Sequence, residues 1–206
     1  MKLRPIATIG LLFAAGFLLL AWNNSVQARQ DIRSVLSTAQ DRALFEAAKS
    51  GDITSIDELL NAGANINCVL RGDGSPLIAA ARKGRVAAVQ VLLDRGADPN
   101  MPVPGDGSPL IMAAREGHAN VVALLLDRGA SVDQIAPQDE NALIQASGRG
   151  HLQIVQFLVK RGADVNARAW AEISGRSGEW RTPLSMARKG GHAAVIDFLL
   201  AAGARE

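Results

Sequence analysis

The feature that most restricts the fold of this chain is an internal repeat with a period of about 33 residues. Glycine-alanine pairs begin at Gly63, Gly96, Gly129, Gly162 and Gly203, so the first four are evenly spaced and the last interval is longer. A leucine series has the same intervals and consists of Leu44, Leu77, Leu110, Leu143 and Leu184. Because one unit of this length cannot bury its apolar face alone, stacked units must share a continuous core.

Within each unit, the residue types predict two short helices followed by a stop. The first helix should follow a side-chain oxygen that caps its free amides, and these caps are Ser75, Ser108, Asn141 and Thr182. Prolines after three of these caps fit the first helical position, where no amide donor is needed. Apolar residues at helical spacing predict a second helix over residues 86–94, 120–127, 152–160 and 193–201. A glycine such as Gly129 then allows the left-handed conformation that ends the helix.

The amino-acid sequence of the repeat resembles that of a known family. Segments 75–80, 108–113 and 182–187 read Ser-Pro-Leu-Ile-Ala-Ala, Ser-Pro-Leu-Ile-Met-Ala and Thr-Pro-Leu-Ser-Met-Ala. With the Gly-Ala pairs that follow them, they resemble the ankyrin repeat. This resemblance implies an all-α solenoid of helix-turn-helix units joined by hairpin-like fingers, with units at about 41–68, 74–101, 107–134, 140–167 and 181–206. The array is also similar to ankyrin arrays attached to BlaR-type bacterial metallopeptidases, although no peptidase domain accompanies it.

The ends and joints of the array depart from the regular pattern. Residues 29–40 form a lead-in, in which the segment 34–40 could extend the first helix as a cap. An insertion at about 169–180 accounts for the longer last interval. In the last unit, Arg188 occupies a position that is usually a buried alanine, as expected if no further unit covers that face.

The amino terminus has the layout of a secretory signal peptide over residues 1–28. Lys2 and Arg4 precede an apolar run from Ile6 to Trp22, and a polar exit ends at Ala28. Cleavage after Ala28 predicts a periplasmic or secreted protein. The length of the apolar run also lies at the short end for a membrane span, which leaves an uncleaved inner-membrane anchor facing the periplasm as the alternative.

The composition argues against several function classes. The 22 basic and 20 acidic residues balance once Lys2 and Arg4 are removed, so no nucleic-acid partner is expected. The single Cys68 rules out an internal disulfide and leaves too few thiolates for a structural zinc site. No catalytic or phosphate-binding motif accompanies the histidines, which are His118, His151 and His192. We therefore expect no enzyme activity, cofactor, metal or small-molecule substrate.

Ankyrin arrays usually bind their partners through the concave face formed by the first helices and through the fingers. These two surfaces supply the candidate binding residues. One ladder on that face is basic at four of five positions and comprises Lys49, Arg82, Arg115, Gly148 and Lys189. Its cations either attract an acidic partner or only offset the dipoles of the helices that they end. The candidate contacts on this face are Arg82, Arg115 and Met112.

The fingers supply a second set of candidates. They carry apolar residues at positions 69–70, 102–104 and 135–137, where the family commonly has polar ones. These residues, represented by Leu70 and Val103, either pack on one another or form a patch for a partner.

The insertion holds the only tryptophans that follow the leader, Trp170 and Trp180. A hairpin that turns near Ser174-Gly175-Arg176 would place the two rings opposite each other. The pair either staples its own loop or forms a binding finger together with Arg176, since tryptophan and arginine are enriched at interface hot spots.

The sequence as a whole favours a monomeric, non-enzymatic module that binds a protein partner in the bacterial envelope through its concave face and fingers. Two alternatives use the same surfaces. One is a membrane-anchored accessory of an envelope sensor or peptidase, and the other is an inhibitor or immunity protein against an envelope toxin.

Overall fold

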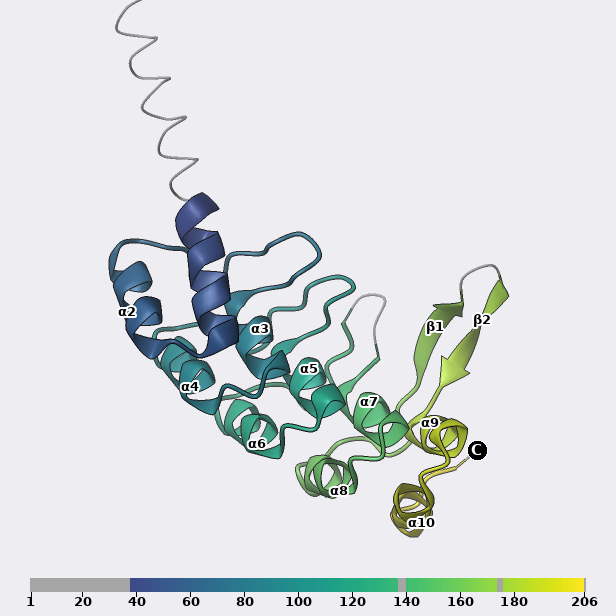
Figure 1. Ribbon diagram of the computed structural model, residues 1–206. Coiled ribbons are helices and arrows are strands. Elements are labelled where there is room, and N and C mark those ends of the chain that lie inside the picture. Colours follow the sequence, from purple (N-terminus) through teal and green to yellow (C-terminus); the bar gives the residue numbers. More distant parts are fainter. Residues whose placement is uncertain (1–37, 137–139, 174–175, 206) are drawn as a thin grey trace, which may run out of the picture.

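The structure, a computed structural model, describes residues 38–136, 140–173 and 176–205, without the side chains of 172, 173, 176 and 177. The predicted leader over residues 1–28 and the lead-in up to residue 37 lie outside the described residues. In Figure 1, the first helices of the units form an inner row, the second helices form an outer row, and the fingers project on one side. None of the described helices is long and apolar enough to cross a membrane.

The elements follow one another in the order that the repeat predicts. After helical residues 38–50 come α2 (Ile53–Asn61), α3 (Pro76–Arg82), α4 (Val86–Asp94), α5 (Pro109–Glu116), α6 (Ala119–Asp127), α7 (Ala142–Gly148), α8 (Leu152–Lys160), β1 (Ala169–Ile173), β2 (Arg176–Arg181), α9 (Pro183–Gly190) and α10 (Ala193–Ala201). The all-α solenoid is confirmed, and the insertion adds one two-stranded sheet to it.

The local signals set the helix bounds as expected. All four predicted caps accept a hydrogen bond from the amide three residues further on, and these caps are Ser75, Ser108, Asn141 and Thr182. The second helices α4, α8 and α10 have the predicted bounds, while α6 begins one residue earlier, at Ala119. Helical residues 38–40 extend the first helix of the array, as predicted for the described part of that segment.

The core consists of small aliphatic side chains that recur once in each unit. The repeated leucines are at most 2% exposed, and they are Leu44, Leu77, Leu110, Leu143 and Leu184. Ile78, Ile111 and Ile144 replace the histidine that the family usually has in its first helix, and they are at most 1% exposed. Apolar packing therefore holds the first turns of these helices.

Polar ladders tie each unit to the next on the outer row. Arginines that follow the second helices pair with aspartates of the preceding unit at 2.6, 2.7 and 2.8 Å, in the pairs Arg95–Asp57, Arg128–Asp94 and Arg161–Asp127. A second ladder joins the loops, where side-chain oxygens accept backbone amides of the next unit in the pairs Asn67–Asp98, Asn100–Ser131, Asp133–Asp164 and Asn166–Arg205. These contacts fix the spacing of the stack.

A histidine ladder lies closer to the inner row. The Nε2 atoms lie 3.0, 3.0 and 3.1 Å from carbonyl oxygens of the preceding unit, in the pairs His118–Arg82, His151–Arg115 and His192–Gly148. Each imidazole packs where the preceding unit has a glycine with positive φ, so these histidines serve the stacking of the units.

This ladder predicts a large effect of a small substitution. At Gly117, φ is +85° and an added Cβ would lie 2.8 Å from Cε1 of His151, whereas Gly129 has φ +86° and open space around it. We expect Gly129→Ala to lower the free energy of unfolding by about 1 kcal/mol through backbone strain alone. Gly117→Ala should lower it by about 2 kcal/mol, because the imidazole must also move. Urea unfolding of both variants measures this difference, and equal losses would contradict the proposed packing.

Candidate functional site

The insertion forms an antiparallel hairpin in which Trp170 is opposite Trp180, as predicted. Their ring centroids lie 5.3 Å apart with an interplanar angle of 69°, which is an edge-to-face arrangement. The two residues remain 48% and 54% exposed. The guanidinium carbon of Arg168 lies 4.9 Å from the centre of the Trp180 ring. One face of the hairpin thus presents an aromatic pair and a cation.

The opposite face of the hairpin is tied to the preceding unit. Arg181 donates a 2.6 Å hydrogen bond to Glu140, whose side chain is only 5% exposed. Arg181 also pairs with Glu179 at 3.0 Å, and Glu179 accepts a further bond from Lys189 at 3.0 Å. Hydrogen bonds from Lys189 and Arg181 lower the pKa of Glu179, and the bond to Glu140 raises the pKa of Arg181. Charge pairing therefore fixes the hairpin on this side.

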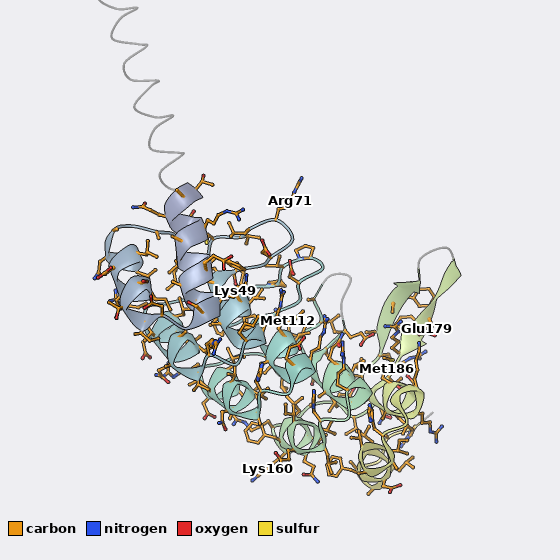
Figure 2. The ribbon with its side chains drawn as sticks, in the orientation of Figure 1. Lys49, Arg71, Met112, Lys160, Glu179 and Met186 are labelled. Atoms are coloured by element: carbon orange, nitrogen blue, oxygen red, sulfur yellow. The ribbon has the colours of Figure 1, made fainter. Side chains whose placement is uncertain are left out.

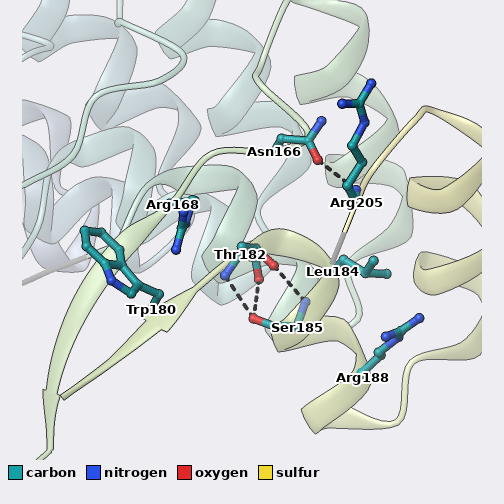
Figure 3. Close-up of a pocket in the computed structure, with 8 residues that line it drawn as sticks. All are labelled: Asn166, Arg168, Trp180, Thr182, Leu184, Ser185, Arg188 and Arg205. Atoms are coloured by element: carbon teal, nitrogen blue, oxygen red, sulfur yellow. Dashed lines mark hydrogen bonds between the residues drawn. The ribbon is translucent and has the colours of Figure 1, made fainter. Parts of the chain in front are cut away.

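A pocket of about 690 Å³ lies between the hairpin and α9, at the end of the array. The residues that line it are Asn166, Arg168, Trp180, Thr182, Leu184, Ser185, Arg188 and Arg205. In Figure 3, Trp180 and Arg168 lie on one side of Thr182, while Leu184, Arg188 and Arg205 lie on the other. Thr182 and Ser185 bond each other reciprocally, in a capping box that starts α9. The pocket combines guanidinium groups, an indole face and hydroxyl groups, and such a surface suits an anionic group with an apolar neighbour.

The basic ladder of the concave face is a row of ion pairs. Each of its four cations has a carboxylate partner, in the pairs Lys49–Glu46, Arg82–Asp106, Arg115–Glu116 and Lys189–Glu179, at 3.2, 2.9, 3.5 and 3.0 Å. Figure 2 shows Lys49, Met112 and Met186 along the inner row, with Lys160 on the opposite side. Because the carboxylates offset the cations, the ladder offers only a weak field to an acidic partner.

Two candidate contacts are buried, which corrects the predicted set of partner-binding residues. Val103 and Met112 are 5% and 2% exposed and pack with Ile78 in a small apolar cluster. Val103 therefore follows the first of the two alternatives for the apolar fingers, which is packing within the array. Neither Val103 nor Met112 presents its side chain to a partner. Leu70 is half-buried in the preceding finger. The side chain of Arg176 lies outside the described residues.

Cys68 is a buried thiol, only 5% exposed, beside the main chain of Asp41. Burial, followed by the charge of Asp41, raises its pKa from 9.0 to about 11. We expect a disulfide reagent at pH 8 to modify Cys68 at least about 100-fold more slowly than free cysteine, because the raised pKa leaves little thiolate at that pH. The rate should rise as the pH approaches the pKa of the thiol and should become ordinary in urea. Rapid modification of the folded chain at pH 8 would contradict the burial.

No group of three histidine, cysteine, aspartate or glutamate residues within the described ranges could hold a metal ion. The histidines are engaged in the stacking ladder, and the thiol is buried.

Sequence reasoning missed Arg168 and Arg205 as residues of the end pocket, although one signal could have placed them together. The loop oxygens that accept amides of the next unit recur through the chain, and the last of them places Asn166 2.8 Å from the Arg205 amide. This spacing brings Arg205 beside the loop that carries Arg168. No comparable signal existed for the bond between Glu140 and Arg181, which lie far apart in the sequence.

Comparison with known proteins agrees with this architecture. The family model described as ankyrin repeats (3 copies) matches residues 102–169. The model described as ankyrin repeats (many copies) matches residues 44–93, 77–126 and 142–200, which is more than half of the chain. No curated protein matches it. Ankyrin repeats are generally protein-protein interaction modules and typically lack enzyme activity. With its stacked helix pairs, capped first helices and matching family models, the chain belongs to the ankyrin repeat family.

Proposed function

We propose that this chain is a non-enzymatic module of the bacterial envelope that binds a protein partner through the open face of its terminal hairpin. The observation that carries the proposal is the exposure of Trp170 and Trp180 on a hairpin whose other face is already fixed by ion pairs. Large aromatic residues are costly to leave in water, and they dominate binding energy where partners cover them. The other units are joined by regular fingers that have no inserted hairpin. Joining two units therefore does not require the hairpin.

Crosslinking in living cells tests this proposal with the full chain. A photoreactive benzoylphenylalanine placed at Trp170 should capture a partner in the envelope fraction. The same group at Leu200, which is 45% exposed on α10, serves as the matched control. A discrete product at position 170 and none at 200 is the expected result. Equal labelling at both positions, or none at either, would refute the binding face.

The envelope location rests on the leader layout and needs a test of its own. The intact mass of the periplasmic protein should correspond to a chain that begins at Arg29. A full-length species that resists carbonate extraction would instead favour the anchored accessory, an alternative suggested by the length of the apolar run.

A further inference from the structure

The end pocket is unusual in this molecule because the charges that line it are of one sign. Three arginines line it, and none of the described residues that line it is an aspartate or glutamate. Along the stack, several arginines pair with carboxylates at 2.6 to 2.9 Å, and these are Arg82, Arg95, Arg128, Arg161 and Arg181. Arg168 and Arg205 therefore bring positive charge to a wall in which none of the described lining residues is a carboxylate.

The positions of two of these arginines are set by the fold. The guanidinium of Arg168 stacks on Trp180 at 4.9 Å and forms no ion pair with a described residue. Arg205 is anchored through its backbone amide, which donates a 2.8 Å bond to Asn166. Both side chains border the same pocket from opposite sides of Thr182 (Figure 3). A ligand that enters here meets Arg168, whose guanidinium rests on the Trp180 ring, and Arg205, whose backbone amide is bonded to Asn166.

The remaining wall adds an apolar floor and a positive helix end. Leu184 is 1% exposed at the base of α9, and the half-exposed indole of Trp180 forms the side. The start of α9 contributes the partial positive charge of a helix N-terminus. Arg188 marks the face that a further unit would cover, because the corresponding residues are Ala81, Ala114 and Ser147, which are buried. The pocket thus lies on the exposed face of the last described unit.

We propose that this pocket binds an acidic segment of the protein partner, with an aspartate or glutamate carboxylate between Arg168 and Arg205 and an apolar neighbour on Trp180. This inference rests on the proposed function and specifies the chemistry of the partner. Guanidinium groups recognise carboxylates through charge-assisted, often bidentate, hydrogen bonds. A volume of about 690 Å³ accommodates several side chains, which is more than a single small anion would fill.

The chemistry of the pocket favours a peptide over a nucleic acid. Nucleic acids are held by extended rows of cations that follow the phosphate backbone. Here Arg168 and Arg205 border a single pocket, whereas cations of the concave ladder and of the outer row pair with carboxylates. A short acidic segment with apolar residues matches this distribution better.

Fluorescence anisotropy with the full chain tests the inference. The probe is a labelled, amidated octapeptide, Ala-Glu-Leu-Glu-Glu-Leu-Glu-Ala, and its twin carries glutamine at each glutamate. The wild-type chain should bind the acidic probe at least about tenfold more tightly than the twin, and affinity should fall with added salt. The double variant Arg168→Gln/Arg205→Gln should weaken binding of the acidic probe by at least about tenfold. Arg71→Gln is the matched control, since Arg71 carries the same charge on a distant exposed finger and should leave affinity unchanged (Figure 2).

Each other outcome overturns the inference. Absence of binding, equal affinity for the twin, or equal affinity of the double variant would do so. A twin with a free carboxyl end that binds as tightly as the acidic probe would assign the pocket to a chain terminus instead. Sedimentation velocity that shows self-association lost in the double variant would make a second copy the occupant. If the double variant still yields the crosslinked partner at position 170, the proposed function stands and only this inference fails.

Discussion

Replacing Arg181 with methionine is expected to lower the free energy of unfolding by about 3 kcal/mol. The guanidinium of Arg181 lies 2.6 Å from the Glu140 carboxylate, whose side chain is 5% exposed. Methionine fills similar space but leaves that carboxylate buried with no counterion. The expected loss lies at the low end for a broken buried pair because the Arg181 side chain is itself 24% exposed, so water can reach part of the site.

Substitution of the other partner, Glu140, provides the control, because Arg181 has a second carboxylate partner. Glu140→Gln leaves Arg181 bonded to Glu179 at 3.0 Å, so it should lower the free energy of unfolding by only about 1 kcal/mol. The double variant Arg181→Met/Glu140→Gln should recover most of the loss caused by Arg181→Met alone. Urea unfolding of the three variants decides the point. Equal losses for the two single variants would show that Glu140 is not dependent on Arg181.

Most of the fold could be predicted because ankyrin units are specified locally. A cap such as Ser75 acts on an amide three residues away, and a repeated leucine such as Leu110 faces the core at a fixed place in each unit. Both signals are visible within a single unit of the sequence, and each is repeated. The pairing of Trp170 with Trp180 was predictable for the same reason, since it depends on a short turn between them.

The candidate site was less predictable because its properties depend on contacts between units. The sequence around Arg82 does not indicate a carboxylate partner, because that partner, Asp106, lies in the next finger. From the sequence, Val103 could either pack or face a partner, and the finger places it against Ile78 and Met112. Burial and charge compensation are settled by the stacking distance, which no single unit encodes.

The second large effect concerns the hairpin, and it separates binding from self-packing. Trp180→Ala should weaken binding of the crosslinked partner by at least about 2 kcal/mol, because Trp180 both faces the pocket and carries Arg168. Trp170→Ala removes the edge-to-face contact but leaves the pocket wall, so its effect on affinity should be smaller. Both variants should lower the free energy of unfolding by a similar amount, about 1 kcal/mol, because each removes the same ring contact.

Deleting residues 173–180, which include Trp180, extends this argument to the whole hairpin. The deletion restores the regular interval between units and keeps Arg181, so Glu140 retains its partner. We expect a chain that still unfolds cooperatively, but with partner affinity reduced at least as much as in Trp180→Ala. Titration of the partner and urea unfolding measure the two properties on the same samples. Unchanged affinity with a lowered unfolding free energy would make the tryptophan pair a staple for its own loop and remove the hairpin from the binding surface.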